Sequence, residues 1–391
     1  MGKSWLLVTI SFLISSVIKS QDSTAVSTLR VAVFTQLYLD SAFTEERLYK
    51  HEMQIPKYIL PGLDFAEGLL IAADSLKQSE NLEIRIYDSR SREQKIETLK
   101  NNNFFDSVHL IIGAVSGNDY RQLSDIALNY QIPFLSATFP NDGGVTKNPF
   151  TILLNPTIGV HCNAIIQFIQ QSFPNSNLIF IQKKSAQDEK IKRLLESSNQ
   201  SKGNKKALKW STYIASENFH IDSVTHLLDS TKQNLIFCAS FDERLATQCL
   251  NYPVYLKSYN LHFIGLPHWE TLKEINLPKH KDKIIYYPTA FYNDGSPEFL
   301  NFQKIFLEKT QGKASDIAYK GYDAGMNFLQ LLIKHKNNLI NQINDPGFQK
   351  LIKYNFQPVK SSIKSQPDYF ENKSVYLIKK QNGITTKMGK F

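Results

Sequence analysis

The fold is decided by residues 108–138, VHLIIGAVSGNDYRQLSDIALNYQIPFLSAT. The stretch opens with the apolar run 108–115, which is typical of a strand buried on both faces of a sheet. Apolar residues then recur at helical spacing over about 120–130, and a second apolar run follows at 132–137. A strand, a helix and a second strand at this spacing predict a βαβ unit with parallel strands.

The same alternation extends to both sides of this stretch. The turn-rich sequence NDGGVTKN at 141–148 marks a boundary, after which the pattern restarts, so we expect two α/β lobes. The predicted strands are 29–37, 82–88, 108–115, 132–137, 151–155, 178–182, 208–214, 234–239, 261–264, 284–292 and 373–380. The predicted helices are about 63–76, 92–101, 120–130, 160–171, 221–230, 241–250, 297–310 and 319–335, with a charged helix that follows the strand 178–182 and ends at about 197.

Length and composition indicate a globular protein of two domains. The chain has 391 residues, of which 42% are hydrophobic and 21% charged, and the charges are scattered rather than grouped in blocks. The formal net charge is +9, but no arginine-rich arm accompanies it. We therefore expect no nucleic-acid partner, and we interpret the basic balance as a lysine-rich composition.

The first twenty residues are typical of an export signal. A positive start at Lys3 is followed by a largely apolar run over 5–18, which is shorter than the roughly 20 residues of a membrane span. We predict a cleaved signal peptide at 1–20 and a periplasmic or secreted mature chain, with no cysteine near the cleavage point to carry a lipid anchor. Cys238 and Cys249 could pair, although buried free thiols are favoured.

Signatures of catalysis and metal binding are absent from the sequence. It contains no G-x-S-x-G, H-E-x-x-H or C-x-x-C motif and no phosphate-binding loop. Isolated histidines such as His161 and His226 are expected on surfaces or helix faces. We predict no catalytic residue, metal or cofactor. An exported α/β enzyme is therefore the least favoured of three functional hypotheses, and the other two are given below.

Small hydroxyl residues follow two neighbouring predicted strands. Ser116 and Gly117 follow the first strand of the opening stretch, and Ser136, Ala137 and Thr138 end the second. Open parallel sheets bind ligands outside the carboxyl ends of their strands, where hydroxyls and free N–H groups suit a carboxylate. Helix capping uses the same residue types, so each group alone also fits a structural role.

In their order and spacing these segments resemble type I periplasmic binding proteins, which include leucine/isoleucine/valine-binding proteins and related receptor ligand-binding domains. The opening stretch is similar to their strand–helix–strand core. Residues 60–76, LPGLDFAEGLLIAADSL, look like their first helix, and Gly321-Tyr322-Asp323-Ala324 resembles a segment near their end. The resemblance covers about 29–332.

The resemblance implies an α/β fold of two lobes, each a parallel sheet flanked by helices, which close on a small ligand. It places 28–150 and 288–335 in lobe one, and 151–287 and 336–391 in lobe two. It implies that a polar ligand, such as an amino acid, is held by residues of both lobes and passed to a membrane transporter or envelope partner. The implied ligand-binding residues are Ser116, Gly117, Ser136, Ala137, Thr138, Phe241, Trp269 and Tyr292.

The sequence also departs from this family. Amino-acid-binding members have an aromatic–glycine pair where this chain has KKSAQDEK at 183–190. Ala114 replaces the usual proline after the strand-end glycine, and the loop 38–61 is long and charged. Two functions therefore compete with the enzyme hypothesis: a solute-binding protein, and a cell-envelope sensing or scaffold protein that keeps the fold without amino-acid binding.

Overall fold

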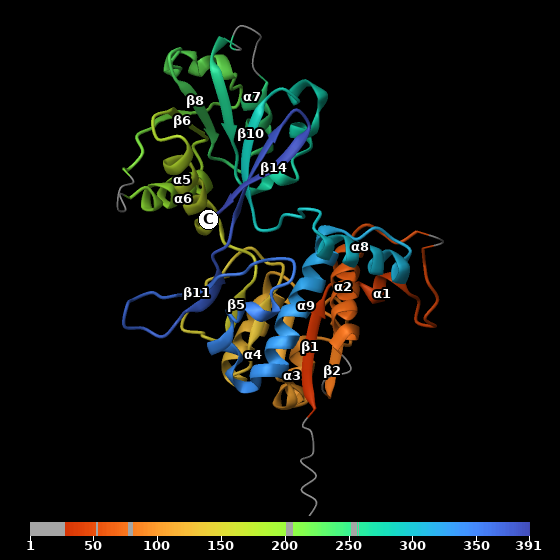
Figure 1. The fold of residues 1–391 in the computed structure, drawn as a ribbon. Helices are drawn as coiled ribbons and strands as arrows, with labels where there is room; N and C mark the ends of the chain where they lie inside the picture. Colours follow the sequence, from red (N-terminus) through yellow and green to blue (C-terminus); the bar gives the residue numbers. More distant parts are fainter. Residues whose placement is uncertain (1–27, 52–53, 77–80, 201–205, 252–255, 257) are drawn as a thin grey trace, which may run out of the picture.

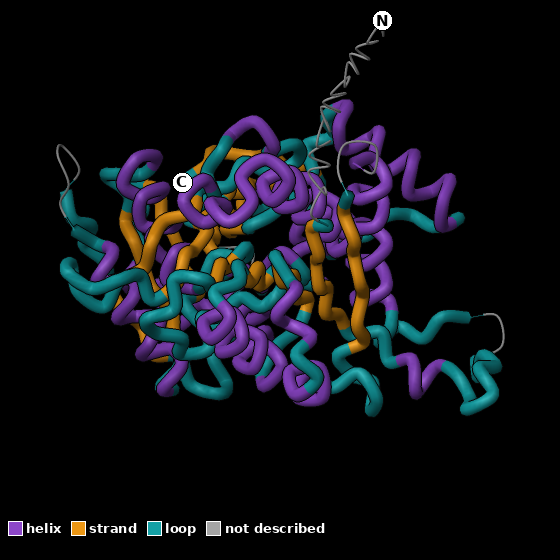
Figure 2. Tube along the Cα trace, turned by 90° about the horizontal axis from the view of Figure 1, so that it is seen from below, coloured by secondary structure: helices purple, strands orange, loops and turns teal. Residues whose placement is uncertain are grey.

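The chain forms two α/β lobes in a computed structural model that describes residues 28–51, 54–76, 81–200, 206–251, 256 and 258–391 (Figure 1). Each lobe is built on one seven-stranded sheet. The strands lie between helices in the view from below (Figure 2). The predicted signal peptide at 1–20 lies outside the described residues.

The sheet of lobe one has the strand order β11-β12-β5-β4-β3-β1-β2. All of its neighbouring strands pair in parallel except β11 and β12, which are antiparallel. Its strands are β1 (Leu29–Thr35), β2 (Leu82–Asp88), β3 (Leu110–Ala114), β4 (Phe134–Ser136), β5 (Thr151–Leu153), β11 (Phe356–Val359) and β12 (Tyr369–Asn372).

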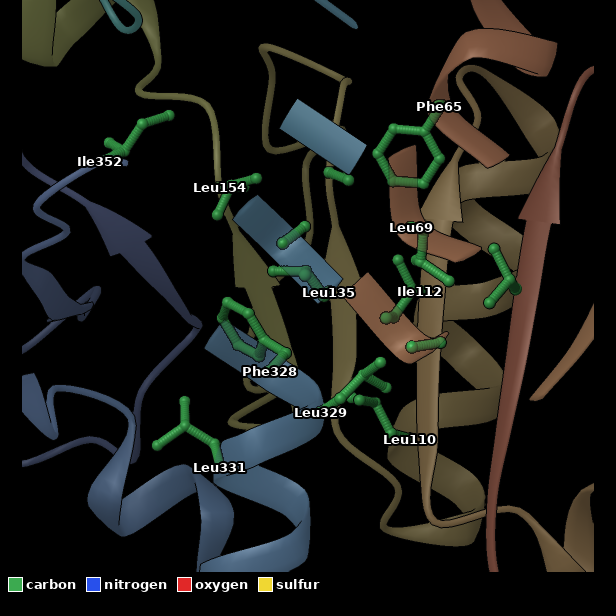
Figure 3. Close-up of a cluster of buried hydrophobic side chains, with 14 of the residues drawn as sticks. Phe65, Leu69, Leu110, Ile112, Leu135, Leu154, Phe328, Leu329, Leu331 and Ile352 are labelled. Carbon is green, nitrogen blue, oxygen red and sulfur yellow. The ribbon is translucent and has the colours of Figure 1, made fainter. Parts of the chain in front are cut away.

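Lobe one is covered by helices from both ends of the chain. Side chains of α2 and α9 form one hydrophobic cluster with residues of β3 and β4 (Figure 3). Its helices are α1 (Leu39–Ala42), α2 (Leu60–Leu76), α3 (Ile96–Asn101), α4 (Asn118–Tyr130), α8 (Pro297–Thr310) and α9 (Asp316–His335), with 3₁₀ turns η1 (Phe104–Ser107), η7 (Lys336–Gln342) and η8 (Pro346–Phe348).

Glycines allow α2 and α9 to cross closely. A Cβ at Gly321 would lie 2.2 Å from the backbone oxygen of Phe65, and one at Gly68 would lie 2.1 Å from that of Ala318. No side chain fits at either distance, so these two positions require glycine. The resembling motifs around α2 and around Gly321 therefore meet each other in space.

The sheet of lobe two has the order β14-β13-β10-β9-β8-β6-β7. β6 to β10 pair in parallel, and β13 and β14 add an antiparallel hairpin at one edge. Its strands are β6 (Asn177–Gln182), β7 (Ser211–Ile214), β8 (Gln233–Cys238), β9 (Asn260–Ile264), β10 (Ile284–Thr289), β13 (Tyr376–Gln381) and β14 (Ile384–Lys390). The helices are α5 (Ile158–Ser172), α6 (Ala186–Ser198) and α7 (Glu243–Leu250), with 3₁₀ turns η2 (Ile221–Leu227), η4 (Pro267–Glu270), η5 (Lys273–Asn276) and η6 (Pro278–His280).

Three segments cross between the lobes, at 154–157, 290–296 and 373–375. The Asn372 side chain ties two parts of this junction together: its amide donates to the Leu154 carbonyl (3.0 Å) and its oxygen accepts from the N–H groups of Asn355 and Ser374. The order lobe one, lobe two, lobe one, lobe two follows the predicted path of the chain.

The described structure corrects the predicted lobe boundaries. Residues 336–372 do not join lobe two, because η7, η8, β11 and β12 pack on or pair with the first sheet, and β5 also belongs to that sheet. Of the segment 336–391, only the last two strands join lobe two. The sheets are also mixed rather than wholly parallel, and the predicted helix 221–230 is a 3₁₀ segment over 221–227.

Three further findings concern features raised by the sequence. Cys162, Cys238 and Cys249 are buried and free. Within the described ranges, no helix has the length and apolar character needed to cross a membrane. In the same part of the chain, no three His, Cys, Asp or Glu side chains group closely enough to hold a metal ion.

Candidate functional site

The carboxyl ends of the parallel strands in each lobe face the crossing segments. In lobe one, β5 leads from this edge into the first crossing, and in lobe two β10 leads from the corresponding edge into the second. Since parallel strands all end at the same edge, the strand ends of each lobe lie on the side turned toward the other lobe. This is the region in which the sequence placed its candidate residues.

The first pair of candidates lies between β3 and α4. Ser116 and Gly117 are both exposed, and Gly117 is the residue before the first turn of α4, with φ 62° and ψ −125°. This positive φ favours glycine, and it turns the chain sharply from the strand into the helix. The start of α4 therefore presents free N–H groups and the Ser116 hydroxyl at the strand-end edge.

The second group of candidates lies at the end of β4, next to the first. Gly113 of β3 pairs with Ser136 of β4, so the residues that follow these strands are neighbours. Ser136 and Ala137 are fully buried, whereas Thr138 is half-buried. The Ser136 hydroxyl has no hydrogen-bond partner, and the Ala137 N–H donates to the Gly113 carbonyl. The structure thus brings the lobe-one candidates together, with Thr138 the most accessible of the second group.

The lobe-two candidates separate into different environments. Phe241 follows β8, is half-buried and packs against the His268 ring with centroids 5.1 Å apart. Trp269 is fully buried in the lobe-two core, and a Cβ at Gly265 would lie within 1.9 Å of its ring. In this conformation Trp269 therefore has no surface to offer a ligand.

Tyr292 lies in the second crossing and belongs with the hairpin of lobe two. Its hydroxyl donates to the Thr385 carbonyl of β14 (3.4 Å), and Lys387 lies 5.7 Å above its ring. The described contacts do not bring Tyr292 together with Phe241.

The segment 183–190, which departs from the family pattern, begins an ordinary capped helix. The Ser185 hydroxyl accepts from the Asp188 N–H at the start of α6. The buried carboxylate of Asp188 accepts from the Lys183 N–H (2.7 Å) and from the Ser240 hydroxyl (3.1 Å). Polar contacts between the ends of β6 and β8 thus fill this position.

An ion pair adds to the polar contacts within lobe two at this position. The Lys183 ammonium lies 2.5 Å from an oxygen of Asp242 and 3.5 Å from one of Glu217. The Asp242 hydrogen bond raises the pKa of Lys183 above its ordinary value, so this lysine stays charged and paired. Lys183 is consequently committed to lobe two itself rather than open to a ligand.

Three residues that the sequence analysis did not select lie where the lobes meet. Glu270 ends η4 and accepts from the Thr289 hydroxyl (2.8 Å). His161 lies in the first turns of α5, and Lys320 lies in the first turns of α9. His161 is a buried residue of helix α5, within the expectation of a surface or helix-face position.

Electrostatic effects show that these residues are close to one another. Burial, and to a smaller extent the charge of Lys320, lower the pKa of His161 to about 3. Burial also lowers the pKa of Lys320, while Glu270 and Asp316 act in the opposite direction. Loss of hydration raises the pKa of Glu270. His161 and Glu270 belong to lobe two and Lys320 to lobe one, so the cluster spans both lobes.

Two pockets in the described part of the chain lie away from the candidate residues. One, of about 840 Å³, lies between the loop after α1 and residues 91–94, and is lined by Asp40, Phe43, Arg47 and Arg92 among others. The other, of about 610 Å³, lies between α8 and the start of α9. Neither includes a residue that the sequence selected.

Comparison with solved structures identifies the fold. A Rhodospirillum rubrum protein whose name refers to a branched-chain amino acid ABC transporter is 14% identical and has a TM-score of 0.66, with 92% of this chain and 100% of that chain covered. A branched-chain amino acid ABC transporter periplasmic ligand-binding protein from Burkholderia xenovorans is 12% identical, with a TM-score of 0.64 and coverage of 93% and 95%.

A third similar structure is an ABC transporter substrate-binding protein from Desulfitobacterium hafniense in complex with Leu. It is 15% identical, with a TM-score of 0.54 and coverage of 92% and 99%. No protein-family model and no curated protein matches the sequence. At these identities the likeness concerns the fold: the chain has the two-lobed α/β fold of type I periplasmic binding proteins.

Proposed function

We propose that this chain is an exported solute-binding protein that reversibly captures a small polar ligand, an amino acid or a related molecule, in a cleft between its lobes. The observation that carries the proposal is the arrangement of strand ends. Both sheets turn the carboxyl ends of their parallel strands toward the other lobe, and three crossing segments join the two. Such edges are where open α/β sheets bind ligands.

In this proposal lobe one holds a carboxylate of the ligand. The hydroxyls of Ser116 and Thr138 and the N–H groups that begin α4 would bind it, with Gly117 allowing close approach. Ser136 and Ala137 lie beneath and support this surface. Lobe two would contribute Phe241 and Tyr292. Trp269 is not included because it is part of the core.

The printed names of the structural neighbours support a solute-binding role. They describe ABC transporter proteins for branched-chain amino acids and a complex with Leu. By analogy we propose a membrane transporter as the partner, a periplasmic or secreted location, and no catalytic activity.

Binding measurements on serine and threonine variants test the proposal. Calorimetric titration with free L-amino acids, leucine and isoleucine among them, gives the reference affinity. The double variant Ser116→Ala, Thr138→Ala should bind at least tenfold more weakly, equivalent to about 1.4 kcal/mol. Ser107→Ala, Thr310→Ala removes the same atoms elsewhere in lobe one and should bind normally. An unchanged affinity in the first double variant would rule out this site.

Two observations favour a second candidate, a cell-envelope sensing or scaffold protein. The Lys183–Asp242 ion pair fills a position that amino-acid-binding members use differently. In addition, large apolar side chains are exposed together on the segment after β1: Leu39, Phe43, Leu48, Tyr49, Ile55, Tyr58 and Leu60. Tight small-molecule binding, together with no partner recovered from envelope fractions, would argue against this candidate.

A further inference from the structure

The first turns of α9 lie at the strand-end edge of lobe one. α2 begins at the end of β1, since a Cβ at Gly62 would lie 2.0 Å from the Gln36 oxygen. The start of α9 is tied to the start of α2 by a hydrogen bond from the Ser315 hydroxyl to Asp64. Lys320, one turn further along α9, therefore lies at the edge that faces lobe two.

His161 comes to the same place from lobe two. α5 follows the first crossing directly and runs back along the sheet to β6, so its first turns lie at the strand-end edge of that lobe. His161 is 6% exposed and its Nδ1 has no hydrogen-bond partner. Its pKa is lowered by burial and then by the charge of Lys320, so at neutral pH the ring is uncharged.

Lys320 is half-buried and forms no ion pair or hydrogen bond with the described residues. Two carboxylates act on it at longer range, Glu270 and Asp316, and both favour its charged form. Glu270 is fixed at the end of β10 by the Thr289 hydroxyl. A desolvated ammonium without an acceptor is costly, and an anionic group is the partner that compensates for this cost most fully.

We infer that Lys320 and His161 form an anion subsite between the lobes, which takes a second anionic group of the ligand, a carboxylate or a phosphate. The inference rests on the proposed function, in which Ser116 and Thr138 hold the first carboxylate. Lys320 supplies charged N–H donors from lobe one, and the neutral imidazole of His161 supplies one N–H donor from lobe two. The ligand class is therefore a molecule with two acidic groups, and the second group links the two lobes when they close.

The test compares ligands that differ by one charge. L-glutamate is compared with L-glutamine, and O-phospho-L-serine with L-serine, by calorimetric titration of the full mature chain. We expect at least one charged member to bind tenfold or more tightly than its neutral counterpart. A preference confined to L-glutamate assigns the subsite to a carboxylate, and one confined to O-phospho-L-serine assigns it to a phosphate.

Substitutions of Lys320 and His161 then test whether these residues cause the preference for the charged ligand. Lys320→Met, which keeps the length of the side chain, should bring the two ligands of a pair to within about threefold, and Lys320→Arg should retain most of the preference. His161→Gln should weaken it several-fold. Lys304→Met, on the exposed face of α8, is the matched control and should bind as the wild type does. Thermal melting checks that each variant is folded. If Lys320→Met does not fold, the effect of His161→Gln on the preference tests the inference instead.

Several results would overturn the inference. Equal binding of both members of each pair by the wild type, or an undiminished preference in Lys320→Met, would show that no anion subsite exists here. Binding of L-leucine without binding of either charged ligand would overturn the inference and leave the proposed function standing. If no amino acid of either kind binds, the proposed function fails, and this subsite fails with it.

Discussion

Removal of the Asp323 carboxylate tests how α9 holds the segment 351–354 in lobe one. Asp323 is fully buried in α9, and its Oδ1 accepts from the N–H groups of Leu351 (2.9 Å) and Ile352 (3.4 Å). Its Oδ2 accepts from the Tyr354 hydroxyl at 2.5 Å. This one side chain thus holds the segment that leads into β11.

The magnitude follows from these three donors. Asp323→Ala leaves two backbone N–H groups and a hydroxyl buried without an acceptor, each at about 1 kcal/mol or more, so we expect a loss of about 3 kcal/mol at pH 7. A loss of this size lowers Tm by roughly 6–12 °C in a protein of a few hundred residues. Tyr354→Phe removes one donor only and should cost about 1 kcal/mol.

The same residue makes stability depend on pH. Burial raises the pKa of Asp323 from 3.8 to about 6 against the effect of its hydrogen bonds. The folded chain then binds this proton more tightly than the unfolded chain, so protonation of Asp323 adds to the free energy of unfolding. This contribution is complete below pH 3.8 and is lost as the pH rises through 6. The free-energy gap between wild type and Asp323→Asn should change by about 3 kcal/mol across this window, in favour of the wild type at low pH.

Urea unfolding followed by circular dichroism at pH 3.5 and pH 7, on either side of this window, measures both effects. Asp125→Ala, an exposed carboxylate on α4, is the control and should change stability by less than about 0.5 kcal/mol. A loss below 1 kcal/mol for Asp323→Ala, or a gap to Asp323→Asn that does not change with pH, would refute the reasoning.

Two further predictions concern packing and burial. Gly321→Ala should lower the free energy of unfolding in urea by about 2 kcal/mol or more, because a Cβ there would meet the α2 backbone. The control Gly159→Ala, whose Cβ would lie 3.5 Å from its nearest neighbour, should be neutral or slightly stabilising. Equal effects of the two substitutions would contradict the close helix crossing. A thiol reagent should not label the three cysteines, Cys162, Cys238 and Cys249, in the native protein and should label all of them in denaturant. Each cysteine is fully buried, and burial raises the pKa of Cys162 to about 12. Rapid labelling of the native protein would contradict their placement.

The central strands and the helices between them could be predicted from the sequence because their patterns are local. β3, α4 and β4 lie within 108–138, where buried parallel strands give continuous apolar runs and the helix gives a 3.6-residue period. The two-lobe path of the chain followed from the repetition of this pattern and from the resemblance.

The C-terminal strands could not all be predicted in this way. β11 and β12 have four residues each, and β11 contains a proline, so neither gives a clear alternation. Their assignment to lobe one depends on pairing with β5, which is distant in sequence. β14 did have a local signal: Asn382-Gly383 adopts positive φ at both residues, as a two-residue hairpin turn requires.

The candidate site was only half accessible to sequence reasoning. Ser116 and Thr138 follow adjacent strands, so topology alone places them together. His161, Glu270 and Lys320 come from three distant elements of two lobes, and only the crossings bring them near one another. Trp269 was selected for its place after a strand, but the turn of η4 directs its ring into the core.

The most direct test of ligand capture between the lobes is the mass of the mature chain, purified without denaturation and recorded under native and then denaturing conditions. The account predicts a small additional mass in the native spectrum that is lost on denaturation. Fragmentation of the released molecule should show that it contains an acidic group. A bare native mass, followed by no thermal stabilisation with free amino acids, O-phospho-L-serine or short peptides, would contradict solute binding and favour the scaffold candidate.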